Sequence, residues 1–195
     1  MTLWLRVHRS ITPAVIVVMC AILSGLIGTT RLPALNLTGH FYEGFPVRVV
    51  LPAIASSSVL ASLATPTSRA QRAASRPPAA LEIRHVLGFV VLAGLLAEAL
   101  TLVSGSGDLG VFTRNVAGMA GAGLLFRRHF GVVVAAIVPV AWGIAMLTFG
   151  NPNGDQLMSW PGLPSLSVDS LVQPALLLVA GLLVGTGRGV TTRAS

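Results

Sequence analysis

The stretch Val86–Ser104 reads VLGFVVLAGLLAEALTLVS, and its 19 residues include a single charged side chain, Glu98. A helix needs about 20 residues to cross the hydrocarbon core of a bilayer, with a range of about 17–25. A run of this length and composition is typical of a transmembrane helix. The stretch therefore predicts a membrane-spanning segment.

Five more apolar blocks of similar length lie along the chain. They are Ile11–Gly28, Phe45–Ala64, Val111–Phe126, Val132–Phe149 and Leu171–Gly187. The block Val111–Phe126 is the shortest. It is long enough to cross the membrane only if Arg114 or the Arg127 end reaches the membrane–water interface. We expect it near the centre of the helix assembly. The first block predicts a retained helix rather than a cleaved signal peptide, because no small-x-small cleavage site follows it.

The composition agrees with a chain that lies mostly in lipid. Hydrophobic residues make up 53% and charged residues only 10%, and the mean hydropathy is +0.81. A soluble domain averages about 25% charged residues because its surface faces water. We therefore predict an all-α polytopic membrane protein, with residues 1–195 forming one transmembrane domain of about six helices.

The arginines predict the orientation of the six helices. All 13 basic residues are Arg, two of them lie within apolar blocks, and only Arg31 falls on one side of the predicted membrane. The other side collects ten: Arg6, Arg9, Arg69, Arg72, Arg76, Arg84, Arg127, Arg128, Arg188 and Arg193. Arginine-rich loops stay in the cytoplasm. Both termini are therefore expected to be cytoplasmic.

Three charged residues fall within the predicted spans: Arg48, Glu98 and Arg114. Charges at membrane depth are costly, so each is a functional hypothesis. A short Ser/Gly turn makes the third and fourth helices antiparallel neighbours, which favours an ion pair between Glu98 and Arg114. Glu98 and Arg114 form such a structural pair, or the arginines extend to the outer headgroups. The alternative is that the three residues contact a substrate. We therefore expect Glu98→Gln to damage assembly or transport more than Glu82→Gln does.

Small residues recur at helical spacing in two spans. Gly118, Gly121 and Ala122 share a face of the fourth, and Gly181 and Gly185 form a GxxxG pattern in the sixth. Small side chains let helix backbones approach closely in lipid. These residues are expected to pack helix against helix.

Other classes of function lack their sequence signals. No zinc-protease, nucleophile-elbow or phosphate-loop motif occurs, so the chain is not expected to be an enzyme. The single cysteine, Cys20, has no ligand spacing, and no metal site is expected. The positive charge of +7 is spread between apolar blocks rather than gathered on one basic face, which argues against nucleic acid.

The layout resembles the permease subunit of a type V ATP-binding-cassette exporter. Permeases of this family have six helices, an N-terminal amphipathic elbow, a cytoplasmic coupling element and a re-entrant external region. Here the corresponding segments are Met1–Ser10, Thr65–His85 and Asn151–Ser170, the last containing Trp160. The resemblance implies that Arg69, Arg72, Arg76 and Arg84 couple the chain to an ATPase.

A more local resemblance runs from Thr113–Gly118 through Arg127 and continues in Pro139–Trp142. It is similar to small permease-like proteins found beside ATPase genes in antibiotic-producing actinobacteria. The resemblance implies a bacterial cytoplasmic membrane, a separate ATPase chain carrying ATP and Mg, and a second permease copy or paralogue. No cofactor is expected on this chain. The cargo would be an amphiphilic small molecule, lipid or peptide moved outward.

Two alternatives remain open at this point. One is the substrate-binding membrane subunit of a vitamin importer, which has a similar size and helix number. The other is a membrane immunity or scaffold protein that transports nothing. Uptake of labelled vitamins, compared with resistance to an exported toxin, separates these functions.

Overall fold

A computed structural model describes residues 11–28, 30–32, 45–63, 78–104, 110–149, 160–162 and 168–185. Within these residues the chain is all-helical apart from one pair of two-residue strands. The elements are α2 (Ile11–Ile27), β1 (Arg31–Leu32), β2 (Phe45–Pro46), α3 (Val47–Ser62), α5 (Pro78–Ser104), α6 (Gly110–Phe149), the 3₁₀ turn η2 (Trp160–Gly162) and α7 (Val168–Gly185).

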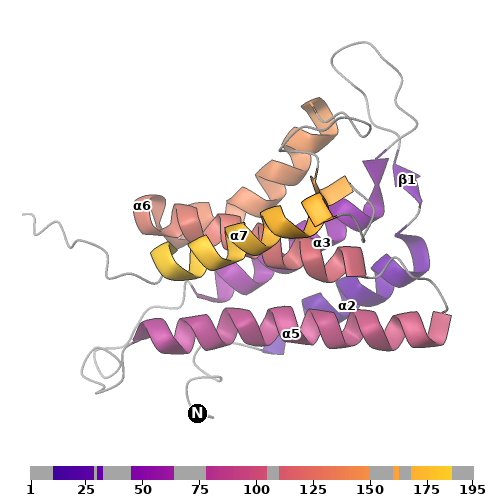
Figure 1. Cartoon of the computed structure of the whole chain (residues 1–195), viewed down its shortest axis with the longest axis horizontal. Helices are drawn as coiled ribbons and strands as arrows, with labels where there is room; N and C mark the ends of the chain where they lie inside the picture. Colours follow the sequence, from indigo (N-terminus) through magenta and orange to yellow (C-terminus); the bar gives the residue numbers. More distant parts are fainter. Residues whose placement is uncertain are drawn as a thin grey trace, which may run out of the picture.

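Helix α6 is interrupted at Gly131, whose φ of 82° and ψ of 178° lie outside the helical region. This backbone conformation is essentially restricted to glycine, because a Cβ would clash with the chain. The two halves, 110–130 and 132–149, meet there at an angle (Figure 1). The apolar blocks Val111–Phe126 and Val132–Phe149 place the end of the fourth helix at Phe126, which is wrong: residues 127–130 are helical as well, and the chain bends at Gly131.

Helix α5 begins at Pro78, well before the predicted start at Val86. Proline suits the first helical position because its missing N–H has no intrahelical partner there. The predicted coupling segment Thr65–His85 is therefore partly helical, and residues 65–77 lie outside the described part of the chain. The predicted elbow, residues 1–10, also lies outside it. Of the predicted re-entrant segment 151–170, the structure describes η2 and the start of α7.

The first half of α6 lies at the centre of the bundle. From Val111 to Leu124 every residue is buried except the half-buried Thr113 and Ala117. The expectation that this segment is central is confirmed. Helices α3 and α7 pack against it, as the contacts Ser56–Val116 and Gly121–Leu177 show.

Helices α2 and α3 are joined by the two short strands. They pair antiparallel, with Arg31 opposite Pro46 and Leu32 opposite Phe45. The first two backbone N–H groups of α3 are also satisfied here. Val47 N donates to Thr30 O (3.1 Å) and Arg48 N donates to Gly28 O (3.2 Å). A helix start lacks intrahelical acceptors for these donors, so the end of α2 caps α3.

Among the described residues, two stretches are long and apolar enough to cross a membrane, Leu81–Val103 and Gly110–Met146. Three shorter helical stretches, Ile11–Ile27, Val47–Ser62 and Ser170–Val184, are apolar as well. The outer faces carry many large apolar side chains. Leu102 is 79% exposed, Leu183 is 73% exposed and Val133 is 67% exposed.

Substitution of Gly131 tests the bend in α6. We expect Gly131→Ala to lower the free energy of unfolding by about 1–3 kcal/mol, because alanine is strained at this φ. Unfolding of the purified chain by denaturing detergent measures the change. Gly88→Ala in α5 is the control, since a Cβ there also meets nothing within 4 Å but the backbone is helical. Equal stability of the two variants would contradict the interpretation.

Candidate functional site

A polar cluster lies at one end of the bundle, where α6 begins. Arg114 donates from Nη2 to the carbonyl oxygens of Trp160 (3.0 Å) and Pro161 (3.4 Å). Asn115 donates from Nδ2 to Pro161 O (2.9 Å), and its Oδ1 accepts from Arg114 Nε (3.2 Å). Both side chains are buried, at 5% and 0% exposed. They therefore supply hydrogen-bond donors to buried carbonyls of η2.

Arg48 reaches the same turn from α3. Its Nη2 donates to Gly162 O at 3.4 Å. Two of the three predicted intramembrane charges thus hold the backbone of η2. This arrangement has a simple physical cause, since a buried carbonyl without a donor costs free energy comparable to a lost hydrogen bond.

Glycine positions on α6 make room for η2 and α7. A Cβ on Gly118 would collide with the ring of Trp160 and would lie 2.7 Å from Pro174 Cβ. A Cβ on Gly121 would strike the backbone of Leu177, and one on Gly181 would strike the Gly121 carbonyl. Trp160 is 1% exposed, and its ring meets Trp142 edge-on with centroids 6.5 Å apart.

Of the five predicted packing residues, these three lie where α6 meets α7. Ala122 is 2% exposed and belongs to the same buried stretch. The surroundings of Gly185, the last residue of α7, lie outside the described side chains.

Glu98 and Arg114 line one groove between α5, α6 and α7, but they do not pair. The groove has a volume of about 460 Å³. No hydrogen bond or salt bridge joins the two side chains in the described part of the chain, where Arg114 instead donates to backbone carbonyls. Glu98 is exposed on α5. The neighbouring helices were anticipated correctly, whereas the predicted ion pair is not seen.

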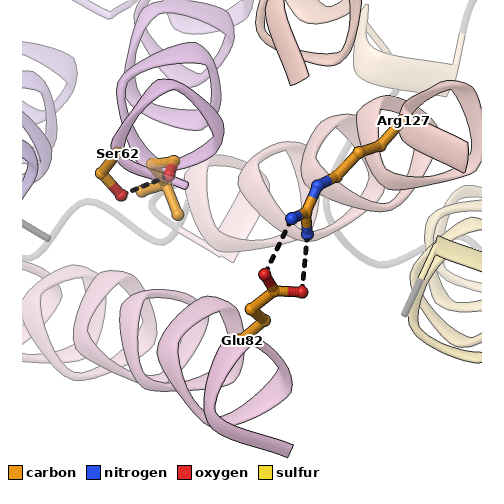
Figure 2. Close-up of polar contacts among 4 residues, drawn as sticks. Ser62, Glu82 and Arg127 are labelled. Atoms are coloured by element: carbon orange, nitrogen blue, oxygen red, sulfur yellow. Dashed lines mark hydrogen bonds and ion pairs between the residues drawn. The ribbon is translucent and has the colours of Figure 1, made fainter. Parts of the chain in front are cut away.

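A second polar site joins the opposite ends of the same helices. The Arg127 guanidinium donates from Nη1 and Nη2 to the two carboxylate oxygens of Glu82, at 2.9 and 2.8 Å (Figure 2). The two side chains are 17% and 19% exposed. Nearby, Ser62 Oγ and His85 Nε2 are 2.8 Å apart, which links the end of α3 to α5. Of the predicted coupling arginines, Arg84 is exposed on α5, and Arg69, Arg72 and Arg76 lie outside the described residues.

Four site residues had not been singled out as functional from the sequence. Asn115 lies inside an apolar block, and its polarity alone was a usable signal. Glu82 and Arg127 lie outside the predicted spans, where a pair between distant segments has no sequence pattern. Thr113 also lines the groove, and its buried Oγ1 has no hydrogen-bond partner. Among the described residues, no group of three or more His, Cys, Asp or Glu side chains is arranged to hold a metal ion.

Comparisons with known proteins found no match to this chain among family models, curated proteins or solved structures.

The two carboxylates of α5 have different surroundings, which predicts different contributions to stability. We expect Glu82→Gln to lower the free energy of unfolding by about 1–2 kcal/mol, because Arg127 loses a half-buried charged partner. Glu98→Gln should change it by less than about 0.5 kcal/mol, since no contact is lost. Denaturation of the purified variants in detergent gives both values. A larger loss for Glu98→Gln would contradict this ranking.

Proposed function

We propose that the chain is a multi-pass protein of the bacterial cytoplasmic membrane with six helical spans. The break at Gly131 divides α6, so that the five helices of the described chain provide six helical segments. Each overlaps one of the six apolar blocks of the sequence. Residues 110–130 and 132–149 give about 32 and 27 Å of helix at 1.5 Å per residue, which is close to a hydrocarbon core of about 30 Å.

The exposed faces of the helices support this placement. In the most apolar window of each long candidate span, only 22% of the residues are buried. A core helix of a soluble protein would be mostly buried, because leaving a Leu or Val side chain in water forfeits about 1.5–3 kcal/mol. The outward Val, Leu and Ile side chains instead suit contact with lipid tails.

The charges support an orientation with both termini in the cytoplasm. The end of α3, the start of α5 and the bend of α6 lie together, as the Ser62–His85 and Glu82–Arg127 contacts require. The end of α7 reaches the same side of the bundle (Figure 1). Arg84, Arg127 and Arg128 gather at this end, which under the positive-inside tendency faces the cytoplasm.

The topology has a direct test. A reporter fused after Ser106 should be active outside the cytoplasm, and one fused after Arg128 should be active inside it. The first half of α6 lies between the two fusion sites. If it crosses the membrane, the two reporters give opposite readings. Identical readings at both sites would show that this segment does not cross the membrane.

Within that frame, we propose that the chain is the permease subunit of an ATP-driven exporter of amphiphilic molecules. The observation that carries the proposal is the groove between α5 and α7. It places Glu98 and the Arg114 side chain in a wall otherwise made of small and apolar residues. A cavity with apolar walls and few polar groups is the usual form of a small-molecule site. ATP and Mg would be bound by a separate ATPase chain at the basic end.

Reconstitution tests the role in export. The full chain, purified from its native membrane, should carry a nucleotide-binding ATPase with it, and a second permease copy or paralogue should be present. In proteoliposomes, that complex should hydrolyse ATP and move a fluorescent amphiphile between leaflets. A matched preparation with an ATPase inactivated at its Mg site is the control. Purification of the chain without any ATPase, under conditions that preserve its fold, would contradict the proposal.

A further inference from the structure

The groove between α5, α6 and α7 is lined mainly by small or apolar residues and by a few polar ones. Most of its lining is small or apolar, contributed by Gly94 and Ala97 from α5, Ala117 from α6, and Leu171 and Leu178 from α7. Its remaining described side chains include a carboxylate, a guanidinium and a hydroxyl. The groove therefore offers polar groups only in one part, with apolar surface around them.

Glu98 is the acidic group of the lining, and the described contacts leave its carboxylate without a protein partner. It lies on the exposed face of α5, which otherwise consists of residues such as Val91, Leu95 and Leu102. A charged side chain within a membrane-spanning helix is costly, most of all near the centre of the bilayer. A cationic group from outside the chain would offset that cost.

Thr113 adds a second acceptor to the same wall. Its buried Oγ1 has no hydrogen-bond partner, and its Cγ2 would lie 3.5 Å from a Cβ on Gly94. Gly94 and Glu98 are one helical turn apart, so they share a face of α5 at about 5–6 Å. The Thr113 hydroxyl therefore lies beside the face of α5 that carries the Glu98 carboxylate, about one helical turn away.

Arg114 supplies the opposite charge at the groove. Its guanidinium keeps its hydrogen bonds to the η2 carbonyls, which fix its position. The charge still acts at a distance, because attraction between charges is weakly screened where water is scarce. The groove therefore presents a negative and a positive group that are held apart on different helices.

We propose that this groove binds the headgroup of a zwitterionic amphiphile that carries a primary ammonium next to a phosphate or carboxylate. The ammonium donates to Glu98 and Thr113, and the anionic group lies toward Arg114. The apolar tails leave the groove along the exposed Leu95 and Leu102 side of α5. The proposal rests on the membrane placement above and specifies the class of cargo.

Phosphatidylethanolamine and phosphatidylcholine of equal chain length provide the test. The choline nitrogen has the same charge but no N–H to donate. Native mass spectrometry of the full chain, purified in nonionic detergent with an equal mixture of the two lipids, compares their binding directly. We expect about tenfold preference for phosphatidylethanolamine, which corresponds to about 1.4 kcal/mol. Soluble glycerophosphoethanolamine should bind far more weakly, since it has no tails.

Substitutions locate the preference within the groove. Glu98→Gln should abolish it, Thr113→Val should reduce it to about threefold, and Thr113→Ser should restore it. Glu82→Gln removes a carboxylate from the same helix outside the groove, so it should leave the preference intact even if it lowers stability. A melting curve of each variant confirms that it is folded.

Three results would overturn the proposal. The first is equal binding of the two lipids by the unaltered chain, and the second is a preference that survives Glu98→Gln. The third is tighter binding of the anionic lipid phosphatidylglycerol than of phosphatidylethanolamine, which would indicate a basic lipid surface instead. Because this assay contains no ATPase or nucleotide, its failure leaves the export proposal standing with another cargo. Failure of ATPase association likewise leaves the lipid assay interpretable.

Discussion

The close approach of α6 and α7 backbones determines where the other elements lie. Gly121 and Gly181 meet with no room for a Cβ on either, and Gly118 accommodates Trp160 and Pro174. Apolar side chains gain little from leaving lipid for protein, so packing at short range must supply the attraction between helices. The glycines permit that packing over the first half of α6. As a result α7 is held against the centre, and η2 enters the bundle just before it.

The burial of η2 brings a polar requirement with it. The carbonyl groups of Trp160, Pro161 and Gly162 belong to a turn that packs against α3, α6 and α7. Unsatisfied backbone groups cost several kcal/mol in surroundings without water. Arg114, Asn115 and Arg48 supply the donors. Arg48 and Arg114 thus have a structural role that their sequence positions do not indicate, because their partners are backbone atoms of a distant turn.

The helices were predictable from the lengths of the apolar runs, since a span of the proposed kind must cover the hydrocarbon core of a bilayer. The ends of the helices were less predictable from the sequence. The start of α5 at Pro78 lies in a polar segment, and the bend at Gly131 depends on one backbone conformation rather than on a run of charge. The juxtaposition of Glu98 and Arg114 followed from a short connection between neighbouring helices. The Glu82–Arg127 pair did not, because both residues lie in polar segments where any of several charged partners was compatible with the pattern.

The two ends of α5 differ in how their charges are balanced. At the end near the α6 bend, Glu82 is matched by Arg127 through two hydrogen bonds, and His85 lies against Ser62. At the other end, Arg114 donates to backbone carbonyls and makes no hydrogen bond or salt bridge to Glu98 across the groove. Charge balance within the described helices is therefore local at one end and incomplete at the other. The residue left over is a carboxylate in an apolar wall, beside a hydroxyl that also lacks a donor. Contacts within the folded chain account for the Glu82–Arg127 pair, but not for Glu98 and Thr113 in the groove. The groove is therefore the part of the bundle where a bound ligand would add the most favourable contacts.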